Sequence, residues 1–566
     1  MKNIYLKCLF LGIFALSSIH AAAYECEVGG IYYNLYGMFA EVTYLNDGYD
    51  NESAYSGSVT IPSSIIYNGK SYNVTRIGYQ AFEYCSGLTS VTIPESVTII
   101  RYQAFCDCSS LTSVTIPESV TSIESSAFDG CSSLTSVTIP ESVTCIESRA
   151  FSGCSSLTSV TIPESVTSIE SSAFSGCSGL TSVTIPNSVT SIEMGVFEDC
   201  SGLTSIEIPN SVTSIGNSAF ANCNSLSTIN FPEGLKTIDN DAFYRCEKLK
   251  VIHLPASLEY LGVSIDEDDF VVDEDIINKN PFSYCTSLET VMIDQANPFF
   301  NSRNKCNAII ETSTNRLLLG CVNTKIPNGV QSIGDNAFCG CYGLTAISSD
   351  MQSDALIIPS TVKIIGESAF RDCLNIKSVE LPEGIEEIGD KAFSYTFSLE
   401  SLSLPSTITH IGNGAFGNTF WDWFEIDDEE GAHDLIKLRS VTSHAKIPFG
   451  IDYGTFCYYF IYHFKESSDG YTGRKIQYSD VYIYATLYVP KGTAEEYKKT
   501  NAWSSFRNIV EIGENDISSI NGVDADNNSH LQKEVYSVEG RKQRQLSHGL
   551  NIVRMMDGSV KKVFIK

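Results

Sequence analysis

A 23-residue period runs through the first half of the chain and constrains the fold more than any other feature. It is marked by leucines at eight evenly spaced positions, namely Leu88, Leu111, Leu134, Leu157, Leu180, Leu203, Leu226 and Leu249. Residues 111–133 and 134–156 differ at only three positions. A fixed period of this length is typical of repeat arrays, in which each unit contacts its neighbours and the core grows along one axis. The 566 residues therefore predict one long solenoid in place of several globular domains.

The period stretches and then returns in the second half of the chain. The interval from Leu249 to Leu288 is 39 residues, whereas that from Ile376 to Leu399 is again 23. We therefore expect insertions that interrupt the repeat. The predicted organisation is a signal peptide at 1–23, an N-terminal cap at 24–57, a solenoid at 58–512 with insertions near 262–278 and 417–432 and a C-terminal cap, a linker at 513–530 and a β tail at 531–566.

Each repeat unit contains the pattern of a half-buried strand followed by a break. In Leu111–Pro117 aliphatic residues alternate with Ser and Thr, and the proline ends the strand because it has no amide hydrogen to donate. A second short alternation follows at Val120–Ile123, and Ala127–Cys131 fills the returning arc. Stacking such coils about 4.8 Å apart joins their strands into parallel β ladders. The usual hand of parallel crossovers predicts a right-handed solenoid.

The repeated phrase L-x-x-V-x-I-P-x-x-V-x-x-I-x-x-x-A-F-x-x-C resembles the BspA-type leucine-rich repeat, a bacterial class with 23-residue units. The resemblance covers most of the chain and recurs in register. It implies a curved, strand-lined solenoid on a secreted or surface-attached protein of Bacteroidetes, often an adhesin. It supplies no binding residues, because members of this class differ in their partners.

Cysteine recurs once per unit, three residues before the leucine or its equivalent. The column comprises Cys85, Cys108, Cys131, Cys154, Cys177, Cys200, Cys223, Cys246, Cys285, Cys341 and Cys373. A stack of small buried thiols explains this spacing without oxidation. Disulfides between adjacent coils of an exported protein remain an alternative, because neighbouring Cα atoms lie within the allowed range. Zinc is disfavoured, since paired C-x2-C ligands are absent.

The outward positions of the first predicted ladder form a nearly uncharged row of hydroxyls, which is our first candidate binding surface. Its residues are Ser113, Thr115, Ser136, Thr138, Ser159, Thr161, Ser182 and Thr184. Rows of hydroxyls can hydrogen-bond a protein or a sugar, although Ser and Thr are also common soluble fillers of strands. Two glutamate columns flank this face, one with Glu118 and Glu141 and one with Glu124 and Glu147. They bind a cation or a basic ligand, or they are simply solvated.

The insertion after Phe416 supplies a second candidate surface. It contains Phe420, Trp421, Trp423 and Phe424, followed by an acidic run. Such aromatic residues stack on sugars, insert into a protein partner or close the core where the coil is interrupted. The acidic residues of both insertions lack the spacing of an EF-hand, so no metal site is predicted.

The sequence carries no signature of an enzyme or of a cofactor-binding loop. No G-x-S-x-G, H-E-x-x-H or phosphate-binding glycine loop is present, and the histidines are scattered. The formal charge of −30 disfavours nucleic acid as a partner.

The two ends of the chain indicate export. Residues 1–23 have the basic start, apolar run and small-residue cleavage site of a secretory signal, with an uncleaved anchor as the alternative. The last 36 residues carry three strand-like segments joined by Glu-Gly and Asp-Gly turns. They resemble the C-terminal sorting tails of exported Bacteroidetes proteins, or they form a small accessory β cap. We expect the mature chain to be secreted or at the outer cell surface, without a transmembrane helix.

The expected function is binding without catalysis. The favoured interpretation is an adhesion protein that recognises a host matrix protein, a glycan or another bacterial surface component. The alternatives are a structural spacer and a carbohydrate-capture protein that uses the aromatic insertion loop.

Overall fold

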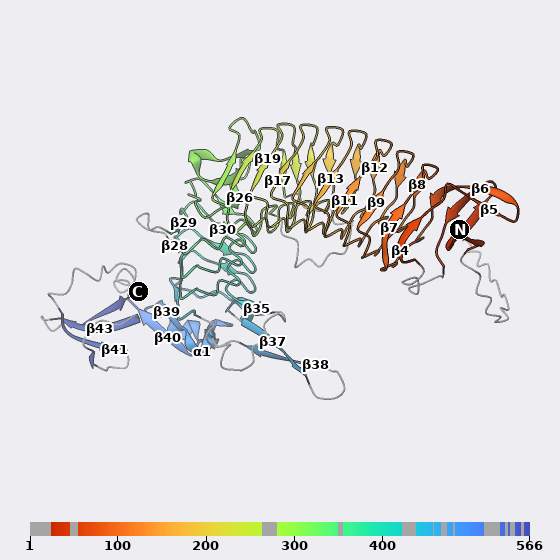
Figure 1. Cartoon of the computed structure of the whole chain (residues 1–566). Coiled ribbons are helices and arrows are strands. Elements are labelled where there is room, and N and C mark those ends of the chain that lie inside the picture. Colours follow the sequence, from red (N-terminus) through yellow and green to blue (C-terminus); the bar gives the residue numbers. More distant parts are fainter. Residues whose placement is uncertain are drawn as a thin grey trace, which may run out of the picture. The chain divides into compact units, whose positions relative to one another are not determined.

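The computed structural model describes most of the repeat region and several strands beyond it. The described residues are 24–45, 55–262, 280–348, 355–420, 437–456, 458–465, 472–478 and 481–513, with strands at 532–537, 542–543, 549–555 and 560–565. The chain divides into two compact units, residues 1–180 and residues 181–566. In both units short parallel strands are stacked side by side (Figure 1). The predicted repeat solenoid with parallel β ladders is confirmed.

An antiparallel meander caps the start of unit 1. β1 (Cys26–Val28) pairs with β2 (Ile31–Tyr36), which pairs with β3 (Phe39–Val42). β3 then runs parallel to β6 (Lys70–Ile77), so the meander covers the first strand of a ladder. β5 (Ser64–Tyr67) forms a hairpin with the same strand.

Two parallel ladders then run through unit 1. The first comprises β4 (Gly57–Thr60), β7 (Leu88–Thr92), β9 (Ser113–Thr115), β11 (Ser136–Thr138) and β13 (Ser159–Thr161). The second continues from β6 through β8 (Ile99–Ile100), β10 (Ser122–Ile123), β12 (Cys145–Ile146) and β14 (Ser168–Ile169).

The alternation in the sequence determines which side chains enter the core. In β9 the central Val114 is buried, whereas the flanking Ser113 and Thr115 are exposed. Pro117 follows the strand, and its carbonyl accepts a hydrogen bond of 3.0 Å from the amide of Val120. The chain therefore turns at the proline and enters the second ladder.

The returning arc of each coil uses left-handed backbone at two positions, which the sequence pattern did not reveal. In the arc that contains Phe128, Ser126 has a φ of 56° and Gly130 a φ of 73°. These turns direct backbone groups towards the next coil, so the amide of Phe128 donates to the carbonyl of Ala150 at 2.8 Å and that of Gly130 to Ser152 at 2.8 Å. The arc thus forms a third row of hydrogen bonds between coils.

A column of phenylalanines fills the interior of unit 1. Phe82, Phe105, Phe128, Phe151 and Phe174 are each fully buried. Successive rings are stacked, with centroids 4.9–5.6 Å apart and planes within 7° of parallel. Because each ring contacts the equivalent ring of the adjacent coil, burial of one side chain depends on the presence of the next coil.

Unit 2 begins with the same two ladders. Its first ladder comprises β15 (Ser182–Thr184), β17 (Ser205–Glu207) and β19 (Thr228–Asn230), followed by the pair β21 (Val251–Leu254) and β23 (Thr290–Ile293). Its second ladder comprises β16 (Ser191–Ile192), β18 (Ser214–Ile215), β20 (Thr237–Ile238) and β22 (Tyr260–Leu261).

An antiparallel meander starts the next array of coils in unit 2. The meander contains β24 (Phe300–Asn301), β25 (Ala308–Glu311) and β26 (Arg316–Gly320), with the 3-10 turn η2 (Arg303–Lys305) between β24 and β25. β26 then pairs with the first strand of a parallel ladder, which comprises β27 (Ser332–Ile333), β30 (Ile364–Ile365), β32 (Glu387–Ile388) and β34 (His410–Ile411). The other ladder comprises β29 (Leu356–Ile357), β28 (Ala346–Ser348), β31 (Ser378–Glu380), β33 (Ser401–Leu404), β36 (Ser440–Ser443), β39 (Thr486–Pro490) and β40 (Asn508–Ile512). A separate sheet contains β35 (Asn418–Phe420), β37 (Tyr458–Lys465) and β38 (Thr472–Tyr478).

Aromatic side chains close the solenoid core at its C-terminal coil, as the sequence predicts. Trp503 and Phe506 are buried beside Phe456 and Tyr482. The indole nitrogen of Trp503 donates to the carbonyl of Phe449 at 2.9 Å. The short helices of this region are η4 (Tyr453–Phe456), α1 (Val481–Tyr484), α2 (Ala494–Tyr497) and η5 (Trp503–Ser505).

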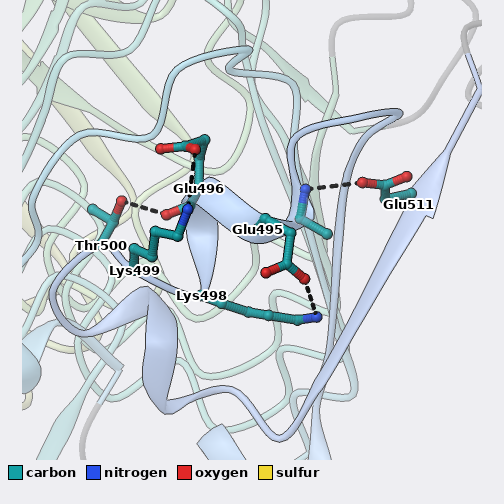
Figure 2. Close-up of polar contacts among 7 residues, drawn as sticks. Glu495, Glu496, Lys498, Lys499, Thr500 and Glu511 are labelled. Carbon is teal, nitrogen blue, oxygen red and sulfur yellow. Dashed lines mark hydrogen bonds and ion pairs between the residues drawn. The ribbon is translucent and has the colours of Figure 1, made fainter.

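Figure 2 shows two ion pairs local to α2 and one hydrogen bond that joins α2 to β40. Lys498 pairs with Glu495 at 2.8 Å, and Lys499 pairs with Glu496 at 3.5 Å. The carboxylate of Glu511, on β40, accepts the amide hydrogen of Ala494 at 3.0 Å. The Glu511 carboxylate thus satisfies one amide in the first turn of the helix, whereas isolated ion pairs at the surface add little stability.

The C-terminal tail contains the strands expected from its sequence. β41 (Gln532–Ser537), β43 (Gly549–Met555) and β44 (Val560–Ile565) form an antiparallel sheet with β42 (Lys542–Gln543). The described part of the chain contains no helix with the length and apolar character needed to cross a membrane.

We predict that Phe128→Ala lowers the unfolding free energy of its cooperative unit by about 3–5 kcal/mol, because the cavity removes stacking contacts on both sides of the ring. Urea denaturation followed by circular dichroism measures the change. Thr115→Ala, an exposed position of the same coil, is the control and should change stability by less than about 0.5 kcal/mol. An equal effect of the two substitutions would contradict the central role of the aromatic column.

Candidate functional site: exposed ladder face and aromatic–arginine patch

The structure brings together the predicted hydroxyl positions of unit 1. Ser113, Ser136 and Ser159 occupy equivalent positions of β9, β11 and β13, and Thr138 pairs with Thr161. Their side chains are exposed, whereas the valines between them point into the core. We call the surface formed by Ser113, Thr115, Ser136, Thr138, Ser159 and Thr161 the ladder face. The two remaining predicted residues, Ser182 and Thr184, lie at the same positions of β15 in unit 2 and are also exposed.

Other columns of hydroxyls in the same coils are used internally. Thr121 donates to the carbonyl of Thr98 in the preceding coil at 3.3 Å, and Ser119 donates to Val97 at 2.7 Å. Thr135 likewise donates to Thr112 at 3.3 Å. By contrast, the six hydroxyls of the ladder face make no hydrogen bond with another described residue. The ladder face therefore keeps its full hydrogen-bonding capacity for solvent or a ligand.

The two glutamate columns differ from one another in the structure. Glu118 and Glu141 are exposed, in agreement with a solvated column. In the second column, Glu124 accepts the amide hydrogen of Tyr102 at 3.0 Å and Glu147 accepts that of Ser125 at 2.9 Å. These carboxylates form hydrogen bonds with the preceding coil. The expectation that both columns consist of solvated carboxylates is therefore wrong for the second column.

The cysteine column lies in the core. Ten of its eleven members are buried and Cys341 is half-buried. The thiols donate to phenylalanine carbonyls of the preceding coil, as from Cys108 to Phe82 at 3.0 Å and from Cys131 to Phe105 at 3.1 Å. Burial raises the pKa of Cys85 to about 11 and that of Cys177 to about 12. Thiols that stay protonated and inaccessible are poor nucleophiles, so the column has the properties of a structural element.

The aromatic insertion falls almost wholly outside the described residues. Phe420 ends β35, which pairs in parallel with β37. Trp421, Trp423 and Phe424 lie outside the described residues, and their role stays a prediction. The same is true of residues 263–279, which make up nearly all of the first predicted insertion.

The first two coils carry a surface that the sequence analysis missed. Where the consensus unit has Ile123-Glu-Ser-Ser126, these coils have Ile77-Gly-Tyr-Gln80 and Ile100-Arg-Tyr-Gln103. The tyrosines so introduced, Tyr79 and Tyr102, are 50% and 41% exposed. The replacement of the consensus serine by tyrosine at these two positions was the feature of the sequence that could have revealed this surface. We name the surface formed by Tyr36, Phe39, Arg76, Tyr79, Arg101 and Tyr102 the aromatic–arginine patch.

The described residues do not assemble a metal-binding cluster: no group of three or more His, Cys, Asp and Glu side chains within them is arranged to hold an ion. The parallel ladders, the buried Leu, Ile and Phe columns and the 23-residue coils define the class of the protein as a leucine-rich repeat solenoid.

The chain belongs to the family described as the BspA type leucine rich repeat region. The family matches in six copies over residues 51–181, 167–305, 309–354 and 349–429, well over half of the chain. Proteins with this fold are generally non-catalytic, and the fold indicates a protein-binding role. No curated protein matches the sequence.

Several solved structures are similar to this chain. A leucine-rich repeat protein from Bacteroides ovatus is 28% identical over 74% of this chain and 95% of its own, with a TM-score of 0.49. A leucine rich cell surface protein from Faecalibacterium prausnitzii is 26% identical over 74% of this chain and 94% of its own, with a TM-score of 0.41. A leucine-rich repeat protein from Eubacterium ventriosum is 20% identical over 70% of this chain and 95% of its own, with a TM-score of 0.40.

We predict that stability falls as the pH rises above about 9 in the presence of a reductant. Ionisation begins near the ordinary pKa of about 9 in unfolded thiols, whereas burial holds the pKa of folded Cys85 at about 11 and Cys177 at about 12. Between the unfolded and the folded pKa the unfolded state loses protons that the folded state keeps. Each such thiol therefore lowers the free energy of unfolding by up to about 1.4 kcal/mol for each pH unit in this interval. Below pH 9 both states are protonated and this dependence disappears.

Urea midpoints measured at pH 8, 9 and 10 test this dependence. Cys131→Ala combined with Cys154→Ala removes two buried thiols, so the variant should show a shallower loss of stability than the parent chain. Identical midpoints at pH 8 and 10, or an unchanged slope in the variant, would contradict the prediction.

Proposed function

We propose that this chain is an exported, non-catalytic binding protein of the cell surface, and that its ladder face recognises a host protein or glycan. The support for export comes from the sequence, in the signal-like segment 1–23 and the sorting-like tail 531–566. Membership of the repeat family supports binding as the general role. Attachment at the outer surface and adhesion are parts of the same proposal.

One observation carries the choice of surface. Of the hydroxyl columns in unit 1, several donate to the preceding coil, whereas the ladder face presents Ser and Thr side chains with no partner among the described residues. These hydroxyls recur at the same strand positions, as in Ser136 opposite Ser159 and Thr138 opposite Thr161. A regular row of donors and acceptors suits a ligand that spans several coils, because each coil adds an equivalent set of contacts.

A spacer is the second candidate. The near identity of residues 111–133 and 134–156 favours it, because recently duplicated units lengthen a solenoid without changing its surface. In that role the ladder face carries no ligand, and the solenoid holds other parts of the chain away from the cell.

We predict that a triple variant, Thr115→Arg with Thr138→Arg and Thr161→Arg, weakens binding at least tenfold, because three large charged side chains cover the ladder face. Binding of the mature chain is measured against a panel of purified extracellular matrix proteins and glycans by biolayer interferometry at micromolar concentration. The expected melting temperature is close to that of the parent, since all three positions are exposed.

The matched control places the same substitutions elsewhere on the same coils. Thr121, Thr144 and Thr167 are exposed threonines beyond the proline turn, and their change to Arg should leave binding intact. Because Thr121 and Thr167 each donate one hydrogen bond to the preceding coil, the melting temperature of this control is measured beside that of the ladder-face variant. Unchanged binding by the ladder-face variant would rule out this surface. If the parent chain binds nothing in the panel, the spacer role is favoured.

A further inference from the structure

The aromatic–arginine patch forms one continuous surface at the N-terminal end of unit 1, distinct from the ladder face. Its first half comes from the cap. The rings of Tyr36 and Phe39 are stacked with centroids 5.5 Å apart, and the guanidinium of Arg76 lies 4.9 Å from the centre of the Phe39 ring. Tyr36 is 44% exposed and the neighbouring Met38 is 81% exposed. The cap therefore presents apolar surface beside a cation.

The second half of the patch comes from the first two coils. The guanidinium of Arg101 lies 4.8 Å from the centre of the Tyr79 ring, and the rings of Tyr79 and Tyr102 are 6.4 Å apart. Buried Glu41 joins the two halves. Its carboxylate lies 3.7 Å from Arg101, and β3 pairs Glu41 with Arg76 on β6. A Cβ at Gly78 would lie 2.6 Å from the carbonyl oxygen of Val42 and 3.0 Å from Glu41 Cγ, so the glycine leaves room for both the strand and the carboxylate.

The guanidiniums of Arg76 and Arg101 have donors that no described residue uses, although Nε of Arg101 is itself buried. The separation of 3.7 Å between Arg101 and Glu41 exceeds a hydrogen bond, and neither Arg76 nor Arg101 donates to an acceptor among the described residues. By contrast, Arg149 on a later coil donates to Asp129 at 3.1 Å. Rings that stack on a guanidinium cover its face but leave its terminal Nη groups available for a planar anion.

Two carboxylates lie beside the patch, and neither closes it. Glu41 is buried beneath the arginines. Glu124 is committed to the amide of Tyr102 at 3.0 Å. The outward surface thus combines exposed aromatic rings with Arg76 and the partly exposed Arg101, whose charge Glu41 offsets in part, in a chain whose formal charge is −30. The acidic remainder of the chain repels densely charged polyanions, which selects for a ligand that carries an isolated anionic group.

We propose that the aromatic–arginine patch binds a glycan through a sugar residue that carries a carboxylate. Such a residue presents an apolar C–H face and a planar anion together. The C–H face packs on Tyr79 and Tyr102, and the carboxylate accepts hydrogen bonds from Arg101 and Arg76. An acidic peptide offers the anion without a matching apolar face. This site goes beyond the proposed function, because it lies on a different surface and does not depend on the ladder face.

The test uses the mature full-length chain and small defined probes. Binding of 3′-sialyllactose is measured by isothermal titration calorimetry and by saturation-transfer NMR, with lactose as the neutral comparison and polyglutamate as the peptide comparison. We expect a Kd for 3′-sialyllactose below about 1 mM and at least tenfold weaker binding of lactose and polyglutamate. Saturation transfer should reach the protons of the acidic sugar.

Four variants locate the site. Tyr79→Ala and Tyr102→Ala should each weaken binding of 3′-sialyllactose at least tenfold, as should Arg76→Gln and Arg101→Gln. Because Arg101 also faces buried Glu41, the two exposed tyrosines keep the test valid if Arg101→Gln lowers the melting temperature. Met194→Ala is the matched control, since Met194 occupies the position of Tyr102 four units later and is 53% exposed. Arg149→Gln controls for removal of an exposed positive charge.

The proposal is overturned if the parent chain fails to bind 3′-sialyllactose, if lactose or polyglutamate binds equally well, or if the control variants lose as much affinity as the patch variants. Failure here is separable from failure of the proposed function. The ladder-face triple variant should retain full binding of 3′-sialyllactose, and the tyrosine variants should retain any binding that depends on the ladder face.

Discussion

Stacking between consecutive coils is the interaction on which the rest of the structure depends. Backbone hydrogen bonds link one coil to the next at three places, in the two ladders and in the arc, as between Phe128 and Ala150 at 2.8 Å. The phenylalanine rings complete the same contact inside, with Phe128 and Phe151 5.4 Å apart. A single coil leaves these groups unpaired and its apolar edge in water, so order in one coil requires order in its neighbours.

The repeat also explains why identical residue types behave differently. A threonine in the ladder face keeps a free hydroxyl, whereas Thr121 in the same coil donates to the preceding coil. A glutamate after the proline is exposed, but Glu147 accepts hydrogen bonds from the amide and hydroxyl of Ser125. The position of a side chain within the 23-residue unit, more than its chemical type, therefore decides whether it is available to a partner.

The period and its alternation predicted the ladders and the buried cysteine column, because these depend on contacts that repeat in register. The burial of Trp503 was expected for a different reason, since apolar residues at the end of a repeat array cover its last coil. The arc was less predictable, since left-handed backbone falls on ordinary residues such as Ser126 and Arg149 as well as on glycine. The attachment of Glu124 to the amide of Tyr102 recurs as Glu147 to Ser125, and it depends on the arrangement of side chains between coils, which the sequence pattern does not specify. The aromatic–arginine patch joins the cap to residues 76–102 and required the three-dimensional pairing of β3 with β6.

Surface residues that differ from the consensus of the 23-residue unit are informative about function, because packing of the core does not require them. Ile100 and Ile123 occupy equivalent inward positions and are both fully buried, so the core of these coils is unchanged. The next residue is Arg101 in one coil and Glu124 in the other, and the two make different contacts from equivalent positions. Arg101 faces Glu41, whereas Glu124 accepts the amide hydrogen of Tyr102. Arg101 lies 3.7 Å from buried Glu41 of the cap and so offsets that charge, but it makes no hydrogen bond to a described residue in place of the one that Glu124 makes. A ligand that accepts hydrogen bonds from that arginine gives a physical reason for its presence.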